Sequence, residues 1–150
     1  MPSIMFETTK WHEGEQWTKM LSIYDATVKG MFPVSRLVTT RFGDTQVHTA
    51  GDPSKPTIVF FHGIATNSIM FGEWLFPELS KDYYCVAIDT MGDLGRSLPR
   101  DGDPSNGPQT DEEMAEWALK VFDELGFQQP VNILGYSFGC CIGCCIARFH

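Results

Sequence analysis

A Gly-x-Ser-x-Gly motif near the end of the sequence constrains the fold more than any other feature. It reads Gly135-Tyr136-Ser137-Phe138-Gly139, follows the apolar run 131–134 and precedes a segment rich in small residues. A serine placed in this way between a predicted strand and a predicted helix is typical of a nucleophile elbow, a strained turn that exposes the hydroxyl. Glycines two positions before and after the serine are expected because any Cβ would collide across so tight a turn. The sequence therefore predicts a strand–turn–helix unit centred on Ser137.

From residue 57 onward, apolar runs typical of strands alternate with helical patterns, which predicts an α/β fold. The runs 57–61, 83–88 and 131–134 are almost continuously apolar, as expected for strands buried on both faces of a parallel sheet. Helical periodicity covers 68–80, 111–125 and 137–149. Thr110 is a good N-cap for the helix 111–125, and Glu113 completes a capping box. Residues 89–106, rich in Gly, Asp and Pro, are predicted to form a long loop.

The first fifty residues predict a helix followed by a β-hairpin. Apolar residues recur every three or four positions over 11–31, and Gly30 and Pro33 are expected to end this helix. Strands are predicted over 36–41 and 46–50, joined by a turn at 42–45. We therefore expect an N-terminal helical extension over residues 1–35, followed by one unit over 36–150 with a mostly parallel sheet of about five strands and flanking helices.

Composition and charge exclude several classes of partner. The formal net charge of -8 argues against nucleic acid and against an anionic membrane surface, because both need clustered Lys and Arg. No apolar run of 18 residues exists to span a bilayer, and the first residues resemble no secretory signal. Five cysteines, an odd number, suggest no disulfide framework. These features together favour a cytoplasmic protein.

Three landmarks in order carry a family resemblance. The first is His62-Gly63 after the run 57–61, the second is the segment 89–97 (Asp-Thr-Met-Gly-Asp-Leu-Gly-Arg-Ser) after the next strand, and the third is the elbow at Ser137. Residues 36–150 thereby resemble the N-terminal half of an α/β-hydrolase. The segment 89–97, one residue longer than the usual family loop, and Thr40-Arg41-Phe42-Gly43 are similar to a bacterial carboxylesterase-like group.

The resemblance implies a sheet of eight strands, of which this sequence supplies five. It also implies that the acid of the catalytic triad follows the sixth or seventh strand and the histidine the eighth, so both are expected to be absent from these 150 residues. With its sixth strand missing, the fifth strand, 131–134, is expected to leave an exposed edge through which the chain self-associates.

The resemblance assigns roles to a small set of residues. Ser137 is the expected nucleophile, and the backbone N–H groups of Ile64 and Phe138 are the expected oxyanion hole. The resemblance also implies a supporting role in this site for five further residues: His62, Gly63, Gly135, Tyr136 and Gly139. Asp89 is expected to hold its loop, and Arg96 and Ser97 to make hydrogen bonds within it.

No histidine in the sequence is well placed to act as the base for Ser137. His150 lies thirteen residues after the serine on a predicted helix, about 20 Å away along its backbone. His12 and His48 lie on elements with no reason to converge on the elbow. His62 is nearer, but the resemblance implies that it shapes the oxyanion loop.

Four cysteines lie close together in the last predicted helix, at positions 140, 141, 144 and 145. Four sulfurs on one regular helix cannot enclose a tetrahedral zinc ion, so no metal site is predicted. They are expected to be small apolar side chains that let the helix press against the sheet. The family resemblance implies no cofactor.

The function that the resemblance implies is hydrolysis of a small carboxylic ester through an acyl-enzyme on Ser137. Two alternatives stay open. The chain could be a truncated, non-catalytic fragment or binding module with an incomplete triad. It could also keep the fold with a different chemistry, as a thioesterase, an acyltransferase or a cofactor-free haloperoxidase.

Overall fold

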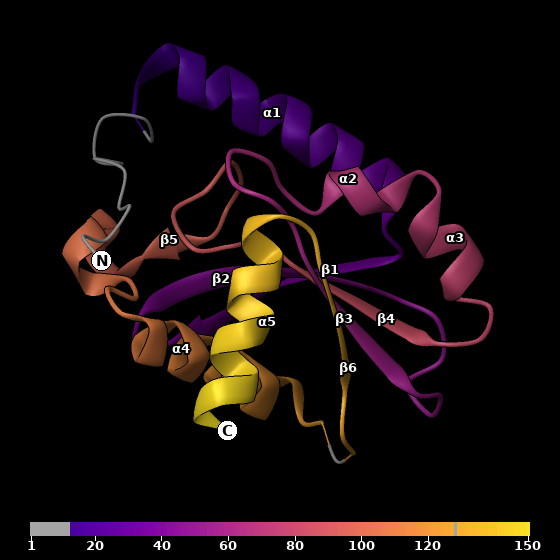
Figure 1. Cartoon of the computed structure of the whole chain (residues 1–150). Coiled ribbons are helices and arrows are strands. Elements are labelled where there is room, and N and C mark those ends of the chain that lie inside the picture. Colours follow the sequence, from indigo (N-terminus) through magenta and orange to yellow (C-terminus); the bar gives the residue numbers. More distant parts are fainter. Residues whose placement is uncertain (1–12, 128) are drawn as a thin grey trace.

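The computed structural model describes residues 13–127 and 129–150. In chain order the helices and strands are α1 (Gly14–Met31), β1 (Val34–Thr40), β2 (Gly43–Ala50), β3 (Thr57–Phe61), α2 (Ile69–Gly72), α3 (Leu75–Leu79), β4 (Tyr84–Ile88), β5 (Leu98–Pro99), α4 (Asp111–Leu125), β6 (Asn132–Gly135) and α5 (Phe138–Phe149) (Figure 1). Two short 3-10 helices, η2 (Arg100–Gly102) and η3 (Pro104–Asn106), follow β5.

The strands form one mixed sheet in the order β1-β2-β4-β3-β6, with β5 paired to β2. The parallel part is β4-β3-β6, whereas β2 runs antiparallel to β1, β4 and β5. The short strand β5 lies where the sequence predicted only loop. It approaches β2 at Gly43, where an added Cβ would lie 2.2 Å from the Leu98 carbonyl oxygen, so the pairing of β5 with β2 requires a glycine at this position.

Helices cover both faces of the sheet, with α4 and α5 on one side and α1, α2 and α3 on the other (Figure 1). Because side chains alternate along a strand, Val59 and Phe61 of β3 enter the α4–α5 core while Phe60 enters the α1–α3 core. All three are fully buried. This two-sided burial is the physical reason why the run 57–61 is continuously apolar.

Helix α1 packs into the α1–α3 core. Tyr24 and Val28 are its buried residues, and Phe32, directly after the helix, stacks on His48 with ring centres 4.4 Å apart. Gly30 lies inside the helix, which ends at Met31, so only Pro33 of the two expected stop signals lies beyond its end.

Helix α4 has the predicted bounds. The Thr110 hydroxyl accepts the Glu113 N–H at 3.1 Å, while the Glu113 carboxylate accepts the N–H of Gln109, one residue before the cap. The fully buried Trp117 donates its indole N–H to Thr45 Oγ1 at 2.9 Å, which ties α4 to β2.

Two local predictions were wrong. The hairpin turn is Arg41–Phe42, because Thr40 pairs with Gly43 and the Phe42 side chain is buried instead of lying in an exposed turn. The expected helix 68–80 is two short helices, α2 and α3. A continuous helix would place Pro77 in its interior, where proline lacks the N–H donor and clashes with the carbonyl of the residue four positions earlier.

Within the described residues, no helix combines the length and the apolar character needed to cross a membrane.

Candidate active site

Ser137 lies in the sharp turn between β6 and α5. Its backbone has φ 51° and ψ −113°, a positive φ that is rare for a residue with a side chain. The residue is exposed, and it directly precedes the first residue of α5. This is the strained strand-to-helix geometry that the motif predicts.

The two motif glycines are required for different reasons. A Cβ on Gly135 would lie 2.5 Å from the backbone N of Cys140, so this glycine avoids a collision across the turn. A Cβ on Gly139 would lie 2.0 Å from the carbonyl oxygen of Phe61, in the neighbouring strand β3. The second glycine therefore allows α5 to approach the sheet, whereas the sequence alone suggested only a collision within the turn.

The loop after β3 lies directly beside the elbow. A Cβ on Gly63 would lie 3.4 Å from the Ser137 Cβ and 3.1 Å from Tyr136 Cδ1, so the absence of a side chain at Gly63 brings the two segments together. Ile64 follows it and is 43% exposed. Phe138 is the first residue of α5, a position whose N–H has no acceptor within the helix. The segments that carry both expected oxyanion donors are therefore adjacent to Ser137.

His62 is fully buried, and both of its ring nitrogens are engaged. Its Nε2 accepts the Thr90 N–H at 2.8 Å, which leaves Nδ1 to donate to the Gly63 carbonyl at 2.7 Å. The ring thus joins the loop after β3 to the loop after β4. With both nitrogens engaged in this way, the ring makes no hydrogen bond to Ser137, and its role in shaping the oxyanion loop stays a prediction.

The other two described histidines do not reach Ser137 either. His48 lies in β2, fully buried, with its two ring nitrogens 2.9 Å from the Tyr24 hydroxyl and 2.8 Å from the Ser35 hydroxyl. His150 caps the far end of α5. His12 lies outside the described residues.

Asp89 is a buried structural carboxylate directly after β4. Its Oδ2 accepts the Tyr24 hydroxyl at 2.5 Å and its Oδ1 accepts the Ser68 N–H at 2.8 Å. The single phenolic proton of Tyr24 is used by Asp89, so His48 Nε2 must donate to the Tyr24 oxygen and His48 Nδ1 must accept from Ser35. This four-membered network connects α1, β1, β2 and the end of β4.

Asp89 is expected to make the protein sensitive to acid. Burial, the largest influence, raises its pKa, but hydrogen bonding from the nearby His48 Nε2–H, 3.7 Å from Oδ2, and from the Ser68 N–H outweighs it, so the pKa lies below its usual value. The ionised carboxylate therefore stabilises the fold above the unfolded-state pKa of about 4, and this contribution is lost as the pH falls through the lower folded-state value. Urea unfolding between pH 7 and pH 2 should show this loss, and it should be smaller in Asp89→Asn. An equal loss in both proteins would contradict the assignment.

The loop 89–97 is held at several points. Ser97 donates to the Asp89 carbonyl at 2.7 Å and accepts the Gln46 N–H at 2.9 Å, as the expected role within the loop requires. Arg96 does not bond within the loop. Its guanidinium instead pairs in a bidentate manner with Asp25 of α1, at 2.7 Å and 2.5 Å.

The cysteines of α5 do not press the helix against the sheet as expected. Cys140, Cys141 and Cys144 are exposed, and the buried face of the helix is formed by Gly139, Ile142 and Ile146. Among the described side chains, no three His, Cys, Asp or Glu residues gather in a way that could hold a metal ion.

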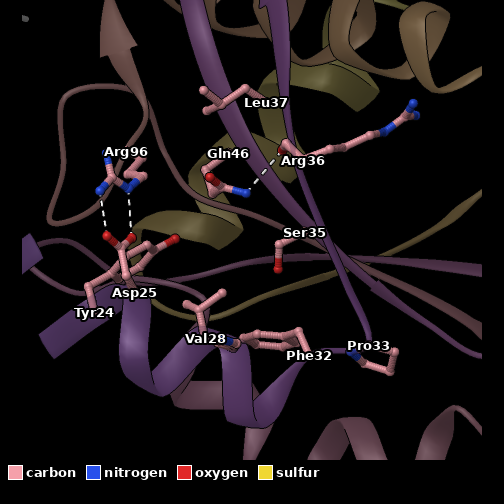
Figure 2. Close-up of a pocket in the computed structure, with 11 residues that line it drawn as sticks. Tyr24, Asp25, Val28, Phe32, Pro33, Ser35, Arg36, Leu37, Gln46 and Arg96 are labelled. Carbon is pink, nitrogen blue, oxygen red and sulfur yellow. Dashed lines mark hydrogen bonds and ion pairs between the residues drawn. The ribbon is translucent and has the colours of Figure 1, made fainter. Parts of the chain in front are cut away.

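A cavity of about 460 Å³ lies beside α1 (Figure 2). Residues of α1 and β1, together with Gln46 and Arg96, form most of its lining, and none comes from β6 or α5. Neither this cavity nor the network around Tyr24 could be predicted from the sequence, because both depend on how α1 packs against the sheet.

Comparisons with known proteins agree with this geometry. Residues 56–150 match the family model described as alpha/beta hydrolase fold. The chain is 30% identical over 128 residues to the uncharacterized carboxylesterase nap of Bacillus subtilis, a match covering 83% of this chain and 38% of that protein. It is 28% identical over 131 residues to carboxylesterase YbfK of the same organism, covering 83% of this chain and 40% of that protein.

Solved structures give the same result. The crystal structure of carboxylesterase CesB (YbfK) from Bacillus subtilis matches with a TM-score of 0.72 at 26% identity, covering 96% of this chain and 45% of that one. Naproxen esterase from Bacillus subtilis matches with a TM-score of 0.72 at 29% identity, covering 91% and 45%. The chain spans about two fifths of the length of the curated relatives. By the family match and these likenesses, the chain belongs to the alpha/beta hydrolase fold family.

Proposed function

We propose that the chain carries the nucleophile and oxyanion hole of a serine esterase that acts on small carboxylic esters. The observation that carries this proposal is the strained, exposed Ser137 at the start of α5, with the Gly63 loop against it. The names of the relatives, which are carboxylesterases, favour ester chemistry over the other reactions of this fold.

In the proposed reaction the Ser137 oxygen forms a bond to the ester carbonyl carbon, and the carbonyl oxygen gains negative charge. The N–H groups of Ile64 and Phe138 stabilise that charge, as fixed donors do without reorganising. The N-terminal end of α5 adds a favourable dipole. The bond from carbon to the alcohol oxygen then breaks, the alcohol takes the proton, and an acyl group remains on Ser137 until water removes it.

A general base is needed to take the Ser137 proton, because a serine hydroxyl is otherwise a weak nucleophile. Among the described histidines, His62 and His48 are engaged elsewhere and His150 caps the far end of α5. This observation favours a second candidate: a module that binds esters or acids at the same site without turnover.

Hydrolysis of p-nitrophenyl acetate tests the proposal. We expect turnover below about 1 s⁻¹, the low end for enzymes, because only oxyanion and binding effects of about 10³–10⁴-fold over water remain without a base. Mass spectrometry should find the acetyl group on Ser137, and Ser137→Ala should remove it. Ser54→Ala, at an exposed loop serine, is the matched control and should react like the parent chain.

Two results would change this assignment. Acetylation spread equally over exposed serines and lysines would show that Ser137 is not especially reactive, and it would favour the binding-module hypothesis over the esterase. Turnover above about 1 s⁻¹ that disappears in Ser137→Ala would show that the 150 residues contain a base.

A further inference from the structure

Helix α1 is fastened to the loop after β4 at two consecutive residues. The Tyr24 hydroxyl donates to Asp89 Oδ2. Figure 2 shows the second contact, in which Asp25 accepts both hydrogen bonds of the Arg96 guanidinium. Tyr24 is 3% exposed, so its bond to Asp89 is shielded from water, whereas the Asp25–Arg96 pair is nearly half exposed on each side. We expect the buried Tyr24–Asp89 hydrogen bond to fix the position of the loop more strongly than the Asp25–Arg96 pair, because exposed ion pairs contribute little to stability.

The loop after β4 in turn holds the loop after β3, on which Ile64 lies. Asp89 Oδ1 accepts the Ser68 N–H at 2.8 Å, and Asp93 Oδ2 accepts the Ala65 N–H at 3.0 Å. The Asn67 side-chain amide donates to the Leu94 carbonyl at 2.8 Å. Three of the residues that follow Ile64 are thus hydrogen-bonded to the segment that contacts α1.

The segment after Ile64 is strained. Ala65 has φ 56°, in the left-handed region that costs a residue with a side chain of the order of 1 kcal/mol. Such a conformation persists only when its surroundings determine it. Loosening the loop after β4 would therefore let Ala65 relax, and the adjacent peptide of Ile64 would move with it.

We infer that Tyr24 is a positioning residue for the oxyanion hole, acting through Asp89 on the loop that presents the Ile64 N–H. The inference rests on the proposed function, and it places a requirement for activity on a helix outside residues 56–150, the part matched by the family model. Without the phenolic oxygen, the buried Asp89 carboxylate loses its donor at Oδ2. His48 Nε2 lies 3.7 Å from that oxygen, beyond normal hydrogen-bond length, so forming a new bond between them would change the geometry of His48 or of Asp89 and its contact with Ser68.

The test is the Tyr24→Phe variant, which keeps the ring and removes one hydroxyl. Hydrogen exchange measured by mass spectrometry should become about tenfold faster or more in residues 62–68, the change expected when a hydrogen bond to a charged group is lost. Exchange in β3 and α4 should stay unchanged. Tyr83→Phe is the matched control, since Tyr83 packs against the same core outside this network, and it should not change exchange in 62–68.

The second measurement is the initial rate of Ser137 acetylation by p-nitrophenyl acetate. Complete loss of one oxyanion donor costs 10²–10³-fold, so displacement of Ile64 should slow Tyr24→Phe by about tenfold. The apparent affinity for the ester should be unchanged, because the donor acts on the transition state. Tyr83→Phe should react at the parent rate.

The outcomes separate the two proposals. Absence of Ser137 acetylation in the parent chain would refute the proposed function, and the exchange measurement would still decide whether α1 positions the loop. Faster exchange throughout α1 and the sheet, or unchanged exchange in 62–68, would overturn the inference, because the first indicates a general stabilising role and the second no coupling. Should Tyr24→Phe fail to fold, Asp25→Asn weakens the neighbouring exposed tie, and it should accelerate exchange in 62–68 by a smaller factor. No acceleration in Asp25→Asn would overturn the inference in that case.

Discussion

A Gly139→Ala variant is expected to lose about 3 kcal/mol of unfolding free energy or more, at the upper end of the range for overpacked sites. The new Cβ would lie 2.0 Å from the Phe61 carbonyl oxygen, 2.6 Å from the Phe61 carbonyl carbon and 2.9 Å from the His62 oxygen. These are backbone atoms of β3 and of the residue after it, and they cannot rotate away as a side chain can. Either α5 must move away from the sheet or β3 must shift.

Gly143→Ala on the same helix is the matched control. Its Cβ would lie 3.3 Å from the Ile133 Cγ2 atom, a side-chain methyl group that can move by a few tenths of an ångström. Alanine also favours the helix over glycine by about 1 kcal/mol. Urea unfolding should therefore give a large loss for Gly139→Ala and a change within about 1 kcal/mol for Gly143→Ala. Similar losses for both would contradict the close contact between α5 and β3.

The second large effect concerns the free edge of β6, through which we propose that the chain associates with copies of itself. The Tyr136 N–H donates to the Phe61 carbonyl at 3.0 Å, toward β3. Because backbone N–H groups alternate along a strand, those of Ile133 and Gly135 point to the other side, where β6 ends the described sheet. No residue of β6 is charged or a proline, so nothing blunts this edge.

The other edge of the sheet, β1, is better protected. Arg36 lies within it and Pro33 lies just before it, and charge and proline at an edge strand both disfavour intermolecular pairing. Any association should therefore involve β6 more than β1.

Light scattering on the purified chain should show species larger than a monomer. The thiols must be kept reduced, so that disulfide bonds between exposed cysteines of α5 do not contribute. In the associated state, hydrogen exchange should slow at residues 131–135 and stay unchanged at 34–40. A stable monomer at high concentration would refute the proposal. Protection from exchange at β1 instead of β6 would also contradict it, because the contact would then lie at the opposite edge of the sheet.

The sequence predicted best those elements that short-range signals determine. Helix α4 has the expected bounds because Thr110 caps its start and Gly126, in the left-handed conformation, ends it. The strand–turn–helix geometry at Ser137 was predicted from the two flanking glycines. The buried strand β3 was predicted from a continuous apolar run, which follows directly from helices on both sheet faces.

Predictions about which face of an element is buried were less successful. In α5 the cysteine pairs suggested a packing face, but Gly139, Ile142 and Ile146 form it, and Cys140, Cys141 and Cys144 remain outside. The hydrophobicity of cysteine and of isoleucine is too similar for periodicity to decide between neighbouring stripes. The close approach of Gly139 to β3 determines which face of α5 is buried.

The sequence by itself determined the α/β architecture, the elbow at Ser137 and the family, because these depend on local patterns and on motifs in a fixed order. The tertiary structure alone decided how α1 is fastened to the site. Tyr24 and Asp89 are 65 residues apart, and Asp25 and Arg96 are 71 apart. Nothing in the sequence near either partner specifies the other, since such pairs form only where the packed apolar side chains of α1 place polar groups within reach across the sheet.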